Sequence, residues 1–262
     1  MSGLRAGTKK QLALGLVIVF MAGWLFFSYY LYTNQVLFVS IEGTILDFEA
    51  TTLALYRGQV DPNIKAVILY LDTPGGLVYP CLEIATHVQE LADEKPVIAV
   101  MGTQCASGGY YIASFASYIY THMNTITGGI GVISVWVDLS EYYEKEGIKI
   151  WVWQTGEEKD MGAEWRSPTQ EENASIQAEV DALFMKLITD ISVNRNLSND
   201  TVTDISTGAV FLGREAQALG LVDAIGNPLT AQAKAAAMAG LWRFITVSQD
   251  MSDAQKFLRA MF

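Results

Sequence analysis

Basic residues are scarce in this chain of 262 residues. Lys and Arg together number 17, against 28 Asp and Glu, so the formal net charge is −11 at pH 7. A surface that binds nucleic acid neutralises phosphates and is therefore basic. The charge balance argues against a nucleic-acid partner, and we predict none.

Cysteine and histidine are scarcer still, with two residues of each. Cys81 and Cys105 leave two alternatives open, a disulfide or two buried thiols, because one follows a proline and the other lies in an apolar run. His87 falls in a predicted helix and His122 near the end of a predicted strand. For both histidines a surface or core role is favoured over catalysis. We predict no metal and no cofactor.

Charge is entirely missing from residues 12–32, a run of 21 residues. As a helix, this run is about long enough to span the core of a bilayer. It ends in aromatic residues, which are typical of the membrane interface. A cleavable signal peptide is the alternative, but its apolar region is shorter and ends in small residues. We therefore predict an uncleaved anchor that contacts the lipid bilayer.

The flanks of this segment predict its orientation. Three basic residues precede it, and no further one follows until Arg57. By the positive-inside rule, residues 1–11 lie in the cytoplasm and the rest of the chain lies outside the cell membrane. We divide that remainder into one soluble domain, residues 35–250, and a C-terminal helical tail, residues 251–262.

Beyond the anchor, short apolar runs alternate with helix-like segments. Continuously apolar strands separated by helices are typical of an α/β domain with a largely parallel sheet and helices on both faces. The predicted strands are residues 36–41, 66–71, 97–101, 118–120, 132–137 and 148–153. The predicted helices include residues 82–91 and 170–194, and we expect another helix to open at Tyr110. No linker interrupts this pattern, so we predict a single domain.

Two glycine-rich turns follow consecutive strands. Gly75 and Gly76 end the first, and Ser107 precedes two glycines, beginning with Gly108, in the second. In such sheets, functional groups gather at the carboxyl ends of the strands. A hydroxyl at a helix N-terminus lies in a field that favours a developing anion, and glycine lets a substrate approach. Ser107 is therefore a candidate nucleophile, with a simple helix N-cap as the alternative.

A nucleophilic serine needs a base. Lys159 follows the predicted strand 148–153 and could reach the same edge of the sheet. Lysine acts as a base when burial lowers its pKa from a reference of about 10.4. Three acidic neighbours favour its charged form unless they point away. Composition alone does not distinguish it from a solvated surface lysine.

Five motifs occur in order along the chain: DTPGG at 72–76, ASGGYY at 106–111, TGGIGVI at 127–133, TGEEKD at 155–160 and GREAQALGLVDAIG at 213–226. Together they resemble the signal peptide peptidase SppA family of membrane-anchored Ser/Lys proteases. The resemblance covers nearly the whole soluble domain and implies a ClpP/crotonase-like fold. It makes residues 35–250 a peptidase domain.

The resemblance also implies roles for single residues. Ser107 corresponds to the nucleophile, Lys159 to the general base 52 residues later, and a backbone N–H of Gly75 or Gly76 to the oxyanion hole. The implied function is hydrolysis of hydrophobic peptides, such as cleaved signal peptides, at the outer surface of the membrane. Relatives assemble into homo-oligomers, and in short members the serine and lysine can come from adjacent protomers.

The chain departs from the family at Gly129. Family members carry a serine there, 22 residues after the nucleophile, whose hydroxyl helps to hold the lysine. Thr127, Thr155 or a water could supply the missing acceptor. A second set of residues is expected to form an apolar groove for substrate, with ordinary core packing as the alternative. This set is Leu77, Val78, Gly108, Ile130 and Val132.

Four other functions are weighed against a Ser/Lys peptidase. A ClpP-like triad needs a histidine about 25 residues after the serine, where Val132 stands. The stomatin-associated ClpP-class membrane proteases place their lysine closer to the serine. A crotonase would meet little coenzyme A outside the cell. A scaffold that has lost catalysis is favoured by Gly129 and opposed by the retained serine and lysine.

Overall fold

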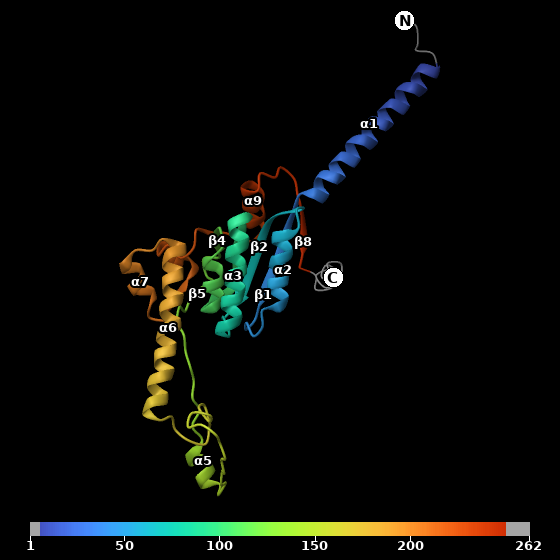
Figure 1. Cartoon of the computed structure of the whole chain (residues 1–262). Coiled ribbons are helices and arrows are strands. Elements are labelled where there is room, and N and C mark those ends of the chain that lie inside the picture. Colours follow the sequence, from blue (N-terminus) through green and yellow to red (C-terminus); the bar gives the residue numbers. More distant parts are fainter. Residues whose placement is uncertain (1–5, 250–262) are drawn as a thin grey trace. The chain divides into compact units, whose positions relative to one another are not determined.

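The computed structural model describes residues 6–249. Their contacts separate two compact units: one comprises the chain up to Gly128 and from Val210 onward, and the other is Gly129–Ala209 (Figure 1). Gly128 and Val210 pair in neighbouring strands, so the second unit is a long excursion that leaves and rejoins the sheet at one place. The sequence analysis did not predict this subdivision. The boundaries at residues 11, 32, 35 and 250 stay predictions, and the tail 251–262 lies outside the described residues.

The first unit is built on a mostly parallel sheet, which confirms the predicted fold class. Its strands are β1 Gln35–Glu42, β2 Ile64–Thr73, β3 Val97–Ala106, β4 Tyr118–Thr121, β5 Ile126–Gly128, β6 Val210–Leu212, β7 Ala224–Ile225 and β8 Ile245–Ser248. The order is β6-β5-β3-β2-β1-β8, and β4 pairs with β3 and β7. Only the β5–β6 pair is antiparallel among these strands.

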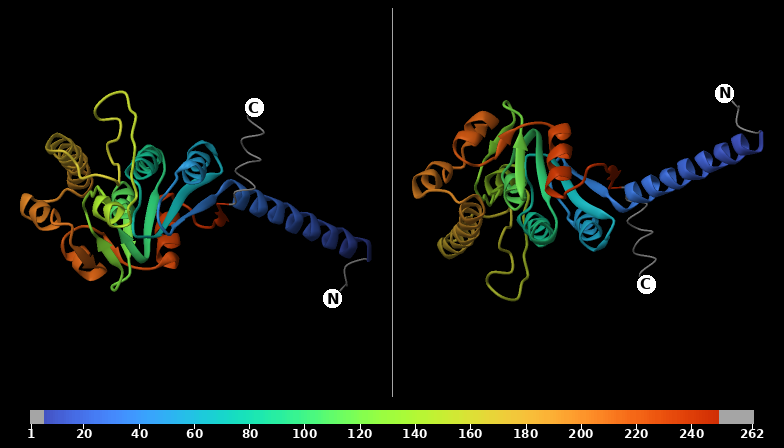
Figure 2. Two further views of the ribbon diagram at one scale, coloured as in Figure 1. Left: turned by 90° about the horizontal axis from the view of Figure 1, so that it is seen from below. Right: turned by 90° about the horizontal axis from the view of Figure 1, so that it is seen from above.

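Helices cover both faces of the sheet. The helices of this unit are α1 Ala6–Thr33, α2 Glu49–Val60, α3 Val78–Glu94, α4 Gly108–Ser114, α8 Gly213–Ala218 and α9 Pro228–Met238. In Figure 2, α2 and α3 lie on one side of the strands and α9 lies on the other. Since each parallel pair β1–β2 and β2–β3 needs a crossover, α2 and α3 carry the chain back over the same face.

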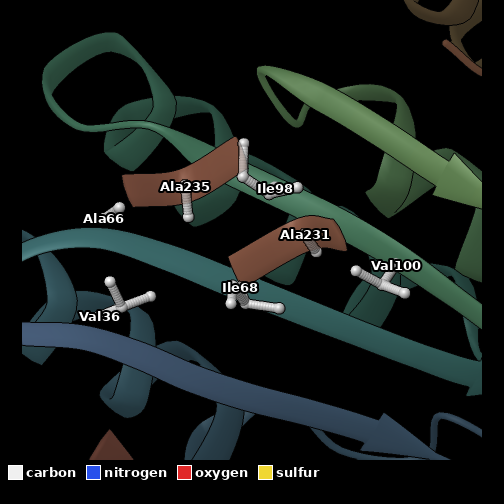
Figure 3. Packing of buried hydrophobic residues seen from close by; sticks show 7 residues of the cluster. All are labelled: Val36, Ala66, Ile68, Ile98, Val100, Ala231 and Ala235. Carbon is white, nitrogen blue, oxygen red and sulfur yellow. The ribbon is translucent and has the colours of Figure 1, made fainter. Parts of the chain in front are cut away.

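The face under α9 has a close-packed core. Branched residues of the central strands, such as Ile68 and Ile98, meet Ala231 and Ala235 of α9, and all four are fully buried (Figure 3). Alanine on the helix lets its axis lie close to the branched side chains. Burying such side chains contributes about 1.5–3 kcal/mol each, so this face stabilises the arrangement that holds the carboxyl ends of β2 and β3 side by side.

Most of helix α1 is exposed. An 18-residue window within Lys10–Thr33 has a mean hydropathy of 2.1, and none of that window is buried within the described chain. The helix is long and apolar enough to cross a membrane, as expected for a single-pass anchor. Strand β1 begins at Gln35, two residues after α1 ends, so the start of the sheet adjoins the end of the anchor helix.

The second unit consists of α5 Ser140–Lys145, α6 Gln170–Arg195 and α7 Asn199–Ile205 with long connecting segments. The helix predicted at 170–194 is confirmed, and Thr169 with Glu172 forms its capping box. The strands predicted at 132–137 and 148–153 are wrong. Both segments are largely apolar, as a buried strand is, but Ile133 is 88% exposed and Trp153 is 87% exposed, and neither segment pairs with a strand in the described chain.

Candidate active site

Ser107 stands at a sharp turn between β3 and α4. Its φ of 53° and ψ of −125° lie in a region that residues other than glycine rarely adopt. The backbone holds it there, because its N–H donates to Gly128 O at 2.8 Å and its carbonyl accepts from Tyr111 N at 3.0 Å. Its hydroxyl makes no cap hydrogen bond, so the N-cap alternative is wrong for the side chain. Strain at an uncapped serine between strand and helix is typical of a nucleophile's turn.

The Gly75 turn packs directly against this serine. A Cβ on Gly75 would lie 2.9 Å from Ser107 Cβ and 2.8 Å from Gly108 N, and φ at Gly75 is +99°. A Cβ on Gly108 would in turn collide with Cys81 Sγ. Both glycines are therefore required by close approach. The two turns that the sequence places at the carboxyl ends of β2 and β3 do meet.

Where the two turns meet, the backbone N–H groups of Gly75, Gly76 and Gly108 differ in whether they have a hydrogen-bond acceptor. Gly75 N donates to Thr73 Oγ1 at 3.0 Å, so that N–H is already used. The N–H groups of Gly76 and Gly108 have no hydrogen-bond acceptor among the described residues. Gly108 is the first residue of α4, where an N–H has no intrahelical acceptor. Of the two expected oxyanion donors, Gly76 is thus the available one, and Gly108 is a second that the sequence analysis assigned only to substrate contact.

Both cysteines are free and buried, so the disulfide alternative is wrong. Burial raises the pKa of Cys81 to about 11. Burial, with a smaller contribution from Asp72, also raises the pKa of Cys105. Since the thiolate is the reactive form, these side chains serve packing: Cys81 fills the space beneath Gly108.

Lys159 belongs to the second unit. It lies in a turn where its N–H donates to Gly156 O at 3.4 Å, and its side chain is exposed. Within the described chain it forms no ion pair with Glu157, Glu158 or Asp160. The three acidic neighbours therefore do not pair with Lys159, and the single chain does not bury its side chain either.

Arg166 binds the carboxylate of Asp160, the residue after Lys159. Its guanidinium donates to both carboxylate oxygens of Asp160, at 2.9 and 2.8 Å, and to both oxygens of Glu172, at 2.7 and 2.6 Å. The same group lies 5.4 Å from the centre of the Trp136 ring. Its hydrogen bonds lower the pKa of Glu172 to about 2 and also lower the pKa of Asp160. This clamp ties the residue after Lys159 to the start of α6.

Sequence reasoning missed the clamp. The available signal was a lone arginine between Asp160 and a helix-capping Glu172, with the three residues spaced six apart. Bidentate arginine pairs of this kind are geometrically specific. Without knowing that the turn folds back onto α6, we could not distinguish Arg166 from a surface charge.

The predicted groove residues separate into two groups. Leu77 is 55% exposed and Val78 is 38% exposed, directly after Gly76. Ile130, in the second unit, is 1% exposed and occupies a core position, which was the alternative interpretation. Val132 is half-buried and lines a pocket of about 640 Å³ in that unit together with Met161.

Two exposed side chains join the first group. Leu46 is 63% exposed and Tyr79 is 60% exposed. The segment that carries Leu46 pairs with the glycine turn, since Ile45 N donates to Gly75 O at 2.9 Å and Leu77 N donates to Ile45 O at 2.8 Å. We call Leu46, Leu77, Val78 and Tyr79 the apolar lip.

Gly129 also has a backbone reason to be glycine. Its φ is +59°, and its N–H donates to Ala209 O at 2.8 Å. Thr127, one candidate for replacing the family's serine, donates its buried hydroxyl to Cys105 O at 2.6 Å.

The histidines have other partners: His87 pairs with Glu90 at 3.5 Å, and His122 Nδ1 accepts from Asn124 N at 3.3 Å.

A protein-family model matches the part of the chain that carries Ser107 and Lys159. The model of peptidase family S49 matches residues 89–242, which include Ser107, Lys159 and Arg166. This chain belongs to peptidase family S49. The resemblance to signal peptide peptidase SppA is thereby confirmed.

Two relatives extend the assignment. The S49 chain is 34% identical over 211 residues to Protease 4 of Haemophilus influenzae, covering 76% of this chain and 34% of that protein. It is 32% identical over 164 residues to the chloroplastic serine protease SPPA of Arabidopsis thaliana, covering 62% of this chain and 24% of that protein. The S49 chain thus spans about a third or less of the length of these two relatives.

A solved structure agrees with the fold. A membrane-bound stomatin-specific protease superposes with a TM-score of 0.53 over 83% of this chain and 94% of that chain, at 18% sequence identity. At this identity the match supports the α/β fold and carries no information on substrate.

Proposed function

We propose that this S49 chain is a membrane-anchored serine endopeptidase with Ser107 as nucleophile and Lys159 as general base. The observation that supports it best is Ser107 itself, a strained and uncapped serine held against Gly75, beside the N–H groups of Gly76 and Gly108, which have no acceptor among the described residues. Neither the sheet nor α4 needs a serine in this conformation. A site that must present a hydroxyl to a substrate does.

The chemistry proceeds in two stages. Ser107 Oγ attacks the peptide carbonyl carbon while its proton passes to neutral Lys159 Nζ, and the N–H groups of Gly76 and Gly108 bind the oxyanion. The C–N bond then breaks as Lys159 returns the proton to the leaving amine, which forms the acyl-enzyme. A water attacks the ester with its proton taken by Lys159, and the acid product leaves as Ser107 recovers its proton.

A neutral lysine requires burial, and Lys159 is exposed in the single chain. We propose that a homo-oligomer supplies that burial, with the serine and lysine of one site drawn from adjacent protomers. Four strongly exposed apolar side chains of the second unit support assembly. They are Ile133 at 88%, Val135 at 75%, Trp151 at 72% and Trp153 at 87%.

The proposed substrates are hydrophobic peptides, such as cleaved signal peptides. The apolar lip beside Gly76 supports this class, because its exposed side chains adjoin the turn that would hold the scissile carbonyl. An extended peptide can also hydrogen-bond to an exposed backbone edge there. We further propose that α1 stays in the cell membrane with the N-terminus in the cytoplasm and the peptidase domain at the outer surface.

Hydrolysis of a fluorogenic hydrophobic peptide tests this function. Full-length protein in detergent should cleave the peptide, whereas Ser107→Ala and Lys159→Ala should not. Ser248→Ala and Lys149→Ala replace an exposed serine and an exposed lysine and serve as matched controls. If the wild type is no faster than Ser107→Ala, the chain is a scaffold rather than a protease, the alternative that Gly129 favours. Mixing the two inactive variants should restore part of the activity if adjacent protomers share a site.

A further inference from the structure

Trp242 lies far from the candidate site, in the loop between α9 and β8. Its ring centre is 5.0 Å from that of Tyr30 and 6.0 Å from that of Phe27, both on α1. These contacts join the end of the anchor helix to a loop more than 200 residues later in the chain. They also place this loop beside α1 along the helix axis.

The depth of Trp242 in the membrane follows from the position of its contacts along α1. A bilayer core of about 30 Å takes about 20 helical residues, so a span that begins at Leu12 ends near Tyr32. Phe27 and Tyr30 precede Thr33, the end of α1, by about 9 and 4.5 Å at 1.5 Å per residue. Trp242 is therefore level with the last two turns of the span, where the hydrocarbon gives way to headgroups.

The loop has two residues that pack inward and two that are exposed. Leu241 and Phe244 pack against the core cluster beneath α9. Between them, Trp242 is 65% exposed and Arg243 is exposed. Trp242 thus stands between two partly buried anchors, and its exposed face has no partner among the described residues of its unit, although burying that face would be favourable.

We propose that this loop is a second membrane contact, in which Trp242 inserts into the bilayer interface and Arg243 binds lipid phosphates. Tryptophan and tyrosine concentrate at this depth because one end of the ring is apolar and the other is polar. Tyr29 and Tyr32, 67% and 60% exposed, continue the same aromatic belt on α1. The inference rests on the proposed insertion of α1.

A second contact fixes how the domain stands on the membrane. One contact lets a domain swing about its linker, whereas two hold the amino ends of β1 and β8 toward the lipid (Figure 1). Strand β3 carries 10 residues between that edge and Ser107, which at 3.3 Å each is about 33 Å. The candidate nucleophile is then held about 30 Å from the headgroups, so a peptide must leave the bilayer before it is cleaved.

Depth measurement with spin labels tests this contact. Trp242→Cys and Arg243→Cys are labelled in the full-length protein in nanodiscs of phosphatidylcholine and phosphatidylglycerol, where the buried native thiols stay unlabelled. Leu46→Cys is the matched control, since Leu46 is 63% exposed but lies beyond the opposite end of β1. Leu16→Cys, in the middle of α1, reports whether the anchor is inserted.

We expect the labels at 242 and 243 to collide more often with oxygen, and less often with a water-soluble nickel chelate, than the label at 46. If the labels at 242, 243 and 46 are equally accessible to oxygen and to the nickel chelate while the label at 16 lies in hydrocarbon, the second membrane contact is wrong. The insertion of α1 is then still supported. An aqueous label at 16 overturns the anchor and this inference together. Neither outcome depends on peptidase activity, so the proposed function is judged separately.

Discussion

Replacing Gly75 with alanine tests the packing of the two turns. The new Cβ would lie 2.8 Å from Gly108 N, 2.9 Å from Ser107 Cβ and 3.0 Å from Ala106 O, and two of these neighbours are backbone atoms. An L-residue at positive φ costs about 1–2 kcal/mol, and overpacking adds about 1–3 kcal/mol. We therefore expect the free energy of unfolding to fall by about 2–5 kcal/mol.

Under the proposed mechanism activity should fall as well, because the added methyl group pushes the turn of Ser107, the proposed nucleophile, away from the proposed oxyanion donor. Losing one such donor costs about 10²-fold to 10³-fold in rate. Gly43→Ala is the control, since Gly43 also has a positive φ, of +74°, but no atom within 4 Å of the new Cβ. It should lose only about 1–2 kcal/mol and keep its activity. Thermal unfolding and peptide hydrolysis check both, and equal losses in the two variants would refute the packing of Gly75 on Ser107.

Four further predictions concern other parts of the chain. Arg166→Ala should lower kcat more than it raises KM, because the change releases the turn that carries Lys159, the proposed base, and leaves the apolar lip untouched. Arg166→Lys, which cannot make two bidentate pairs, should not restore kcat. The wild type should lose stability as the pH falls from 4.5 to about 2, since folding lowers the pKa of Glu172 from 4.5 to about 2. A similar loss of stability in Arg166→Ala would show that the pair with Arg166 is not the cause. Gly129→Ser should lower the unfolding temperature by about 2–4 °C, because a φ of +59° costs a serine about 1 kcal/mol, and an unchanged temperature would argue against that strain. A thiol reagent at pH 8 should modify Cys81 and Cys105 in denaturant and neither in the folded protein, so rapid modification of the native chain would show that they are not buried.

Much of the first unit could be predicted from the sequence. Its strands are continuously apolar because they are buried on both faces, and each is bounded by proline, glycine or a polar turn. The DTPGG and ASGGYY motifs predicted where β2 and β3 end, and the structure confirms that their glycines meet. Local pattern sufficed here because the packing partners of each strand are themselves strands and helices with clear periodicity.

The second unit could not be predicted in the same way. Residues 132–137 are apolar and rich in β-branched residues, as a strand is, but a strand also needs a neighbour, and the described chain offers none. Arg166 was missed for a related reason, since its partners are set by the fold of a long connecting segment. The exposure of Lys159 likewise depends on what contacts this unit, which no pattern within the chain specifies.

Covalent labelling of Ser107 tests directly whether this serine is a nucleophile activated by Lys159. The full-length protein is treated with a fluorophosphonate, which reacts with activated serines, and the modified residue is located by mass spectrometry. We expect a single adduct on Ser107 that disappears in Lys159→Ala and persists in Lys149→Ala. An adduct on another residue, or one on Ser107 that forms equally fast without Lys159, would show that these two residues do not work as nucleophile and base.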